Sequence, residues 1–201
     1  VGSGSAHLVN GHSRLHQECE QQLAEFTGRD RALLFSTGYM ANLAITSALV
    51  TRRDAVFQDR LNHASLIDAA QLSRATYSRY PHNDLERLQY LLEKSQQANP
   101  AGRRLIMTDA VFSMDGDCAP LTQMAEICAA TDSWLMADDA HGFGVLGKKG
   151  AGLSEQENLN QQQLPILMAT LGKAVGVSGA FVAGSEKLIE TLIQKSRSYI
   201  F

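Results

Sequence analysis

The sequence is poor in the residues on which specialised proteins depend. It has three cysteines, four prolines and one tryptophan among 201 residues, and its formal net charge is only −3. An odd number of cysteines without metal-ligand spacing argues against a disulfide framework and favours reduced thiols in a cytosolic protein. The small net charge gives no electrostatic reason to expect a nucleic acid or an anionic membrane as partner. No apolar run approaches the length that spans a bilayer.

The remaining composition is that of an ordinary globular protein. Hydrophobic residues make up 44% of the chain and charged residues 19%, and this length supports a sizeable core in one domain or a large part of one. Val1-Gly2-Ser3 is not a natural start, and the chain stops at Phe201 without a helix stop signal. We therefore expect residues 1–201 to be a fragment of something longer, with no internal domain boundary.

Short apolar runs alternate with helical patterns along the chain. We expect strands at 32–35, 55–58, 76–80, 104–111, 134–138, 166–170 and 180–183. We expect helices at 15–26 (closed by Gly28), 39–50, 64–73, 121–130, from a cap at Asn83 onward, and from Ser185 toward Tyr199, with mostly loop at 142–160. This alternation predicts an α/β fold with a largely parallel sheet covered on both faces.

Ligands of such sheets bind at the carboxyl ends of the strands. The unusual polar residues collect at those ends in this sequence: Thr37, Gly38, His63, Ser113, Asp138, His141 and Lys173. Lys173 is the most informative, because it lies between glycines just after the apolar run 165–169. A desolvated amine there can lose its proton near neutral pH and attack a carbonyl to form a Schiff base. Taken alone, a lysine that reaches solvent beside a loop is the commoner case.

Two other patterns suggest different chemistry. Residues 142–147 match the dinucleotide-binding pattern GxGxxG, but residues 148–152 are a poor helix start. The same stretch nearly forms a P-loop, although Lys149 occupies the position of the magnesium-binding Ser or Thr.

His12 and His16 have zinc spacing, yet Ser13 stands where a glutamate should follow, so we expect two solvated histidines and no metal site.

A pyridoxal 5'-phosphate site needs a lysine, an acid for the pyridine nitrogen, a phosphate cradle and a stacking partner. Lys173 and Asp138 fit the first two needs. The free amides at the helix start 37–39 fit the cradle, and His63 could stack on the ring. His141 and Ser113 could donate to its phenolic oxygen. Each residue alone is more often a satisfied structural polar group.

Four segments together resemble the α-oxoamine synthases, which are pyridoxal-phosphate enzymes of aminotransferase fold type I. The segments are Leu61-Asn62-His63-Ala64-Ser65, 111–117 (VFSMDGD), Asp138-Asp139-Ala140-His141-Gly142 and Thr170-Leu171-Gly172-Lys173. The resemblance runs in order along essentially the whole chain. It implies the large cofactor-binding domain of that fold, with a mostly parallel seven-stranded sheet and helices on both faces.

The resemblance also implies roles for single residues. Lys173 would hold the cofactor and remove the substrate's alpha proton, Asp138 would pair with the pyridine nitrogen, and His63 would stack on the ring. The remaining implied contacts are those of Ser113 and His141 with the phenolic side of the ring, and of Thr170 and the amides of Gly38 and Tyr39 with the phosphate.

Within the family, residues 138–143 and 177–180 resemble the acyltransferases that condense L-alanine with a pimeloyl thioester, carried by coenzyme A or an acyl carrier protein, in biotin biosynthesis. Phe143 replaces a commoner threonine. The alternative is a member that uses glycine and another acyl thioester. A nicotinamide-dependent dehydrogenase built on 142–147 and a non-catalytic subunit of the same fold are rivals of other classes.

The family resemblance further implies a homodimer with the site at the subunit interface. It also implies an N-terminal segment and a small C-terminal domain that are absent from these 201 residues and that help to bind the substrates. We therefore expect this chain alone to be poorly active or inactive.

Overall fold

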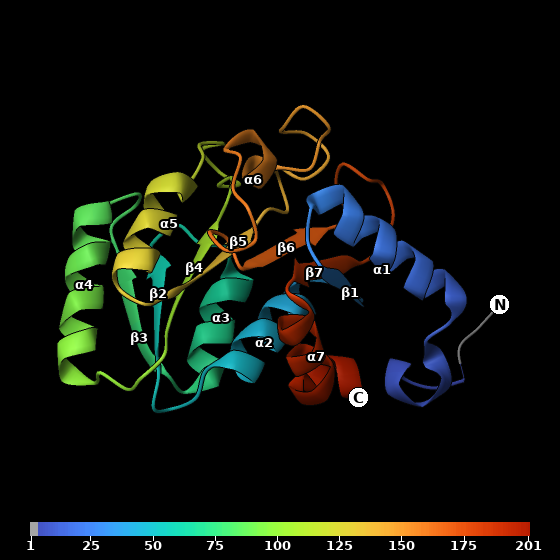
Figure 1. Ribbon diagram of the computed structural model, residues 1–201, viewed down its shortest axis with the longest axis horizontal. Helices are drawn as coiled ribbons and strands as arrows, with labels where there is room; N and C mark the ends of the chain where they lie inside the picture. The colour runs from blue at the N-terminus through green and yellow to red at the C-terminus, as the bar shows by residue number, and fades with distance from the viewer. Residues whose placement is uncertain (1–3) are drawn as a thin grey trace.

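A seven-stranded sheet with helices on both faces forms the computed structural model of this chain, which describes residues 4–201 (Figure 1). The strands lie in the order β1-β7-β6-β5-β4-β2-β3. All neighbours pair in parallel except that β7 runs antiparallel to both β1 and β6. The strands are β1 Arg31–Phe35, β2 Ala55–Asp59, β3 Thr76–Tyr80, β4 Arg104–Asp109, β5 Trp134–Asp138, β6 Ile166–Thr170 and β7 Ala180–Gly184. The predicted α/β fold with a largely parallel sheet is confirmed.

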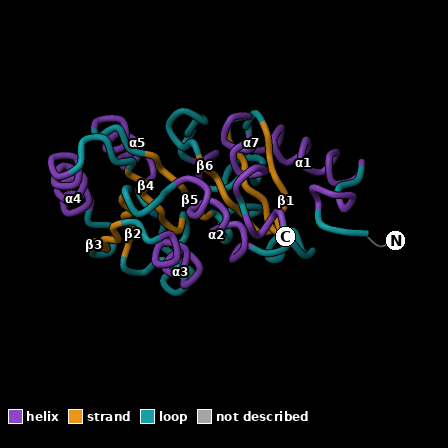
Figure 2. The backbone as a smooth tube through the Cα atoms, turned by 90° about the horizontal axis from the view of Figure 1, so that it is seen from below, coloured by secondary structure: helices purple, strands orange, loops and turns teal. Residues whose placement is uncertain are grey.

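The helices form two layers with the sheet between them (Figures 1 and 2). In Figure 1, α2, α3 and α7 lie on one side of the sheet, and α1 and α5 lie on the other. The helices are η1 His7–Gly11 (a π-helix), α1 Arg14–Thr27, α2 Gly38–Leu49, α3 Ala64–Ser73, α4 Leu85–Ala98, α5 Leu121–Ala130, α6 Leu153–Gln156, α7 Glu186–Lys195 and α8 Arg197–Ile200. None of the helices in the described part of the chain has the length and apolar character that crossing a bilayer requires.

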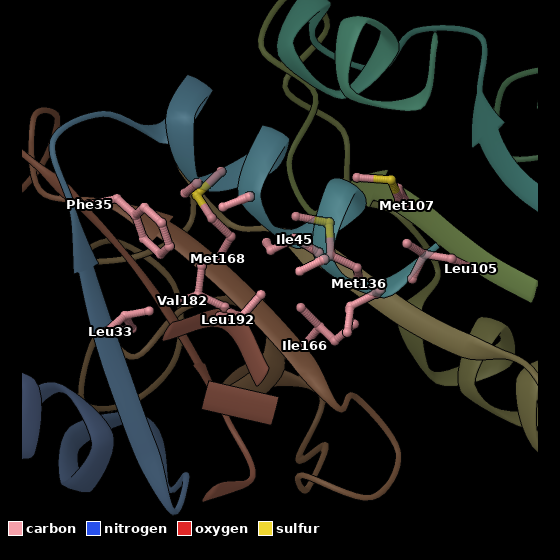
Figure 3. Packing of buried hydrophobic residues seen from close by; sticks show 14 of the residues in the cluster. Leu33, Phe35, Ile45, Leu105, Met107, Met136, Ile166, Met168, Val182 and Leu192 are labelled. Carbon is pink, nitrogen blue, oxygen red and sulfur yellow. The ribbon is translucent and has the colours of Figure 1, made fainter. Parts of the chain in front are cut away.

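Alternating side chains of the central strands enter two separate cores. Leu105 and Met107 pack in the cluster that includes Ile45 of α2, whereas Ile106 between them packs with Leu88 and other residues of the opposite layer (Figure 3). All five side chains are fully buried. Because both faces of the sheet are covered, the strands are continuous apolar runs in the sequence. Burial of each large apolar side chain contributes about 1.5–3 kcal/mol to stability.

The ends of several helices follow local chemistry. Gly28 ends α1 with a φ of 66°, a conformation that costs glycine little. Ser185 caps α7 by accepting a hydrogen bond from the Leu188 amide. The expectation that Asn83 caps α4 is wrong: Asp84 is the cap and accepts from the amide of Arg87. Both residue types are good caps, and Asn83 instead adopts a φ of 53° and donates to the carboxylate of Asp117.

Other boundaries differ from expectation where the chain turns sharply. β4 stops at Asp109, and Val111 forms only an isolated bridge with Cys118 across the turn at 113–116. The helix after Ser185 ends at Lys195, because Ser196 is extended, and α8 follows as a separate helix. The stretch 142–160 contains the one-turn helix α6. The expectation that the chain is a fragment rests partly on residues 1–3, and these lie outside the described residues.

Candidate active site

A cavity of about 180 Å³ opens at the carboxyl ends of β4, β5 and β6, beside the first turns of α2 and α3. It brings together nearly all the residues that the sequence singled out. Its lining consists of Gly38, Tyr39, His63, Ser65, Asp109, Asp138, Ala140, His141, Met168, Thr170 and Lys173. These residues come from segments more than 100 positions apart, and the sheet order places their strand ends side by side.

Asp138 ends β5 at the floor of this cavity and is only 5% exposed. Its Oδ2 accepts a hydrogen bond of 2.9 Å from Nδ2 of Asn42, and its Oδ1 accepts one of 3.1 Å from the amide of Ala140. Burial raises the pKa of Asp138, although these two donors and the charge of Lys173 oppose the rise. A carboxyl group in this position ionises readily only beside a cationic partner.

Asp109, the last residue of β4, is a second carboxyl group at the same level of the sheet. It pairs in register with Asp138, is 4% exposed, and accepts a hydrogen bond of 3.0 Å from the amide of His63. Burial, followed by the charge of Asp138, raises the pKa of Asp109 to about 8. Sequence reasoning missed Asp109, although an acid at the end of the buried run 104–108 gave the same signal that identified Asp138.

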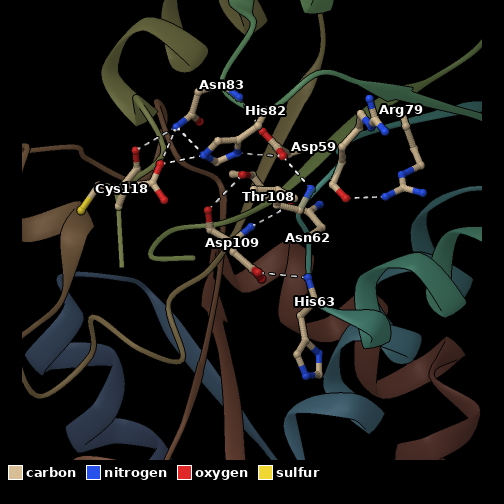
Figure 4. Close-up of polar contacts among 12 residues, drawn as sticks. Asp59, Asn62, His63, Arg79, His82, Asn83, Thr108, Asp109 and Cys118 are labelled. Carbon is tan, nitrogen blue, oxygen red and sulfur yellow. Dashed lines mark hydrogen bonds and ion pairs between the residues drawn. The ribbon is translucent and has the colours of Figure 1, made fainter. Parts of the chain in front are cut away.

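His63 stands at the mouth of the cavity as the cap of α3. Its Nδ1 accepts a hydrogen bond of 3.2 Å from the Ser65 amide and lies 2.8 Å from Oγ of Ser65. The preceding Asn62 is buried and fixes the turn, because its Nδ2 donates to the carbonyl of Met107 at 2.7 Å and its Oδ1 accepts from the Asp109 amide at 3.1 Å (Figure 4). The imidazole is therefore held at its Nδ1 edge.

Lys173 lies in the turn after β6, with its Nζ 2.8 Å from Nε2 of His141. Burial and then the charge of Lys173 lower the pKa of His141. His141 is therefore neutral at pH 7, and its Nε2 can accept a hydrogen bond from the ammonium group. The turn itself is tied down by Thr170, whose Oγ1 donates to the carbonyl of Gly179 at 3.0 Å and accepts from the amide of Gly172 at 3.2 Å.

The start of α2 faces the cavity with unpaired backbone donors. The side chain of Thr37 accepts the amide of Met40 at 3.2 Å. Gly38 and Tyr39, in the first turn, have no acceptor within the helix for their amides. Together with the positive end of the helix dipole, these amides suit an anion such as a phosphate.

Of the residues to which the family resemblance assigns a role, only Ser113 is absent from the lining of the cavity. It is exposed in the turn at 113–116 and is not among the lining residues. Conversely, Asn42 was missed, although it is fully buried and donates both to Asp138 and, at 2.8 Å, to Oγ of Ser65. An asparagine inside the otherwise apolar helical pattern 39–50 was the available signal.

Gly142, the first glycine of the GxGxxG pattern, and Gly152 after the pattern lie against the side chain of Asp139. This residue is 1% exposed, and its Oδ2 accepts from the amide of Leu153 at 2.7 Å. A Cβ atom on Gly142 or Gly152 would lie 2.2 or 1.9 Å from the oxygens of the Asp139 carboxyl group. Residues 140–150 form turns and bends rather than the helix that dinucleotide binding requires.

The fold and the residues of this cavity agree with a known family. A model of aminotransferase class I and II proteins matches residues 2–201. The chain belongs to this family. The implied fold type I architecture is thereby confirmed.

Relatives in the family share much of the sequence. The 8-amino-7-oxononanoate synthase of Cellvibrio japonicus is 60% identical over 201 residues, which are 100% of this chain and 50% of that protein. The enzyme of the same name from Herminiimonas arsenicoxydans is 60% identical over 203 residues, or 100% of this chain and 51% of that protein. This chain therefore spans about half the length of the curated relatives it matches.

Solved structures of the family superpose closely. A serine palmitoyltransferase of Sphingomonas wittichii matches with a TM-score of 0.93 and 32% identity, over 100% of this chain and 49% of that one. The 8-amino-7-oxononanoate synthase of Francisella tularensis matches with a TM-score of 0.83 and 37% identity, over 99% of this chain and 54% of that one. Another serine palmitoyltransferase, with a TM-score of 0.93, contains bound PLP.

Proposed function

We propose that this chain is the cofactor-binding domain of an α-oxoamine synthase that condenses L-alanine with a pimeloyl thioester, with loss of carbon dioxide, to form 8-amino-7-oxononanoate for biotin biosynthesis. The observation that carries the proposal is the 60% identity, along the whole chain, with relatives of that name. Identity to the serine palmitoyltransferases of the same fold is only 32–34%.

The residues around the cavity fit pyridoxal 5'-phosphate. A primary amine, a buried carboxyl group and unpaired amides at a helix start face one space of about 180 Å³. Burial raises the pKa of Asp138. A cationic partner would therefore stabilise its carboxylate, and a protonated ring nitrogen would supply that partner. Lys173 would hold the cofactor, Asp138 the ring nitrogen, and Thr170 with the amides of Gly38 and Tyr39 the phosphate.

Pyridoxal phosphate, when bound, supplies an electron-accepting ring that stabilises negative charge at the alpha carbon of an amino acid. Asp138 keeps this ring protonated, because Asn42 and Ala140 hold its carboxylate in place. His63 covers one face of the ring and excludes water from it. We assign Ser113 to the phenolic side of the ring, as the family resemblance implies, provided that its turn closes toward the cavity.

Lys173 and His141 form the proton-handling pair of the proposed site. The neutral His141 accepts a hydrogen bond from the Nζ of Lys173 across their 2.8 Å contact, which orients the amine. Lys173 would act as a base toward the alpha proton of the substrate in its unprotonated form, which that step needs. His141 in turn can donate to the phenolic oxygen of the ring.

The size of the relatives supports two further parts of the proposal. Because the relatives are about twice as long as this chain, we propose that residues 1–201 are the large domain and that the active protein contains a further small domain.

We also propose a homodimer with the site at the subunit interface. Exposed apolar side chains support a subunit contact at the cavity: Tyr39 lines it, and Leu61, Val175 and Val177 lie in the segments that carry His63 and Lys173.

An assay of the full-length protein with paired substrates tests the proposal. L-Alanine, glycine and L-serine are each combined with pimeloyl, acetyl, succinyl and palmitoyl thioesters of coenzyme A, and with the pimeloyl thioester of an acyl carrier protein. We expect turnover with alanine and a pimeloyl thioester, and release of one carbon dioxide per product. Preference for glycine would favour the alternative member of the family. A requirement for a nicotinamide, or no turnover with any pair, would contradict the proposal.

A further inference from the structure

Arg29 is a buried cation outside the lining of the candidate active site, and two nitrogens of its guanidinium find no acceptor among the described residues. It follows the glycine that ends α1 and is only 7% exposed. Its Nε and Nη2 atoms are buried and have no hydrogen-bond partner among the described residues. No carboxylate of residues 4–201 forms an ion pair with it.

The other arginines of the chain show that this is exceptional. Arg104 is buried to a similar extent, at 4% exposed, and its guanidinium donates to the carbonyls of Gly102 at 2.8 Å and Thr131 at 3.3 Å. Arg31, two positions after Arg29, reaches Glu190 at 3.5 Å. A buried guanidinium that leaves donors unmatched destabilises a fold, so the position of Arg29 indicates an acceptor that residues 4–201 do not supply.

Arg29 lines a cavity of about 360 Å³ between the end of α1 and the segment around α6. Figure 1 shows these two parts of the chain next to each other above the sheet. Lys149 and Asn158 also line the cavity. None of the residues that line the candidate active site takes part.

Two carboxylates line the same cavity but are already engaged. Glu155 accepts hydrogen bonds from the amides of Lys149 and Ala151 at 2.9–3.1 Å. Glu25 is exposed and accepts from Nε2 of Gln21 at 2.9 Å. Neither of them satisfies Arg29, and the loop amides partly balance the charge of Glu155.

We propose that Arg29 binds a small oxyanion in this cavity, in a second ligand site separate from the active site. The planar guanidinium offers parallel N–H groups, the arrangement that recognises the two oxygens of a carboxylate or phosphate. Binding would satisfy the buried donors and link the end of α1 to the segment around α6. The site does not depend on the chemistry proposed for the active site.

Calorimetric titration of inorganic phosphate into the full-length protein tests this site, at constant ionic strength set with chloride. Wild type, Arg29→Met, Arg29→Lys and Lys148→Met are compared. Every variant keeps the amides at the start of α2, so any phosphate bound there contributes equally to all four. We expect saturable binding in wild type that Arg29→Met abolishes. Arg29→Lys should weaken it about fivefold or more, because lysine lacks the planar pair of donors.

Lys148→Met serves as the matched control, since Lys148 is an exposed cation of the same loop that does not line the cavity. We expect it to change phosphate affinity by no more than about twofold, as is usual for an exposed charge. If Arg29→Met does not fold, the comparison of Arg29→Lys with wild type decides alone. Equal phosphate binding in wild type and the Arg29 variants, or no binding in wild type, would overturn the proposal.

Discussion

Asn42 and Asp138 lie 96 positions apart, and their side chains meet in a hydrogen bond of 2.9 Å beneath the candidate active site. The bond joins α2, which starts after the edge strand β1, to the end of the central strand β5. It requires α2 to cross under the sheet, and α2 indeed packs against β6 and β7. The fold thus orients the Asp138 carboxylate from a distant helix.

Replacement of Asn42 by alanine should weaken the site without removing any residue that contacts the cofactor directly. Asp138 would lose a buried donor, and a hydrogen bond to a charged group contributes about 1.5–3 kcal/mol. We expect pyridoxal phosphate to bind about tenfold more weakly, as measured by titration of its visible absorption, equal to about 1.4 kcal/mol.

Thr46→Val is the matched control for this change. Thr46 lies one turn further along α2, is also fully buried, and donates to the carbonyl of Asn42. We expect the valine variant to keep the cofactor affinity of wild type. Equal effects of the two variants would show that Asn42 acts only through the stability of α2.

Asp109 should make the stability of the cofactor-free protein depend on pH. Its pKa is raised to about 8 by burial and by the charge of Asp138, whereas an unfolded aspartate titrates at about 3.9. The folded protein keeps a proton that the unfolded chain releases, so stability falls as pH rises from about 4 to about 8. Asp109→Asn retains an acceptor for the His63 amide but lacks this titration.

Thermal unfolding between pH 4.5 and pH 8.5 measures this effect. We expect the stability of Asp109→Asn relative to wild type to increase steadily across that range. A difference between the two proteins that is constant with pH would contradict the raised pKa.

His82 should stabilise the turn that carries Ser113 in a pH-dependent way. Its Nδ1 lies 3.0 Å from Asp59 and its Nε2 2.7 Å from Asp117 (Figure 4). Burial alone lowers the pKa of His82, but the two carboxylates outweigh burial and raise it above its ordinary value. The ion pairs are therefore fully present below about pH 6.5, the pKa of an unfolded histidine. They are lost as pH rises through the raised value.

His82→Gln tests this contribution by thermal unfolding. We expect the loss of melting temperature relative to wild type to be larger at pH 6 than at pH 9. His16, which is partly exposed and contacts Ser13 at the start of α1, provides the control as His16→Gln, with no comparable change. A His82→Gln effect that grows toward pH 9 would contradict the assigned ion pairs.

Most of the fold could be predicted because a parallel sheet covered on both faces needs apolar strands. The strands at 55–58, 134–138 and 166–170 are such runs, and the polar residues after them lie together in the cavity. β7 could not be predicted to run antiparallel, because strand direction depends on the connection between β6 and β7 and leaves no mark on the pattern of residues.

The parts of the site that the sequence did not reveal depend on contacts between distant segments. Asn42 and Asp109 gain their roles from where α2 and β4 are placed, which spacing along the chain does not specify. Ser113 shows the reverse case, since its motif suggested a place at the site, whereas its turn is not among the residues that line the cavity. Arg29 is likewise notable only because burial removes it from both water and carboxylates.

Covalent trapping of the cofactor tests the central claim most directly. The full-length protein is incubated with pyridoxal phosphate, reduced with borohydride and digested, and the modified lysine is located by mass spectrometry. Lys173→Ala and the exposed control Lys149→Met are treated in parallel. We expect one phosphopyridoxyl group on Lys173 in wild type and in Lys149→Met, and none in Lys173→Ala. A modification on another lysine, or none in wild type, would contradict the assignment of this cavity.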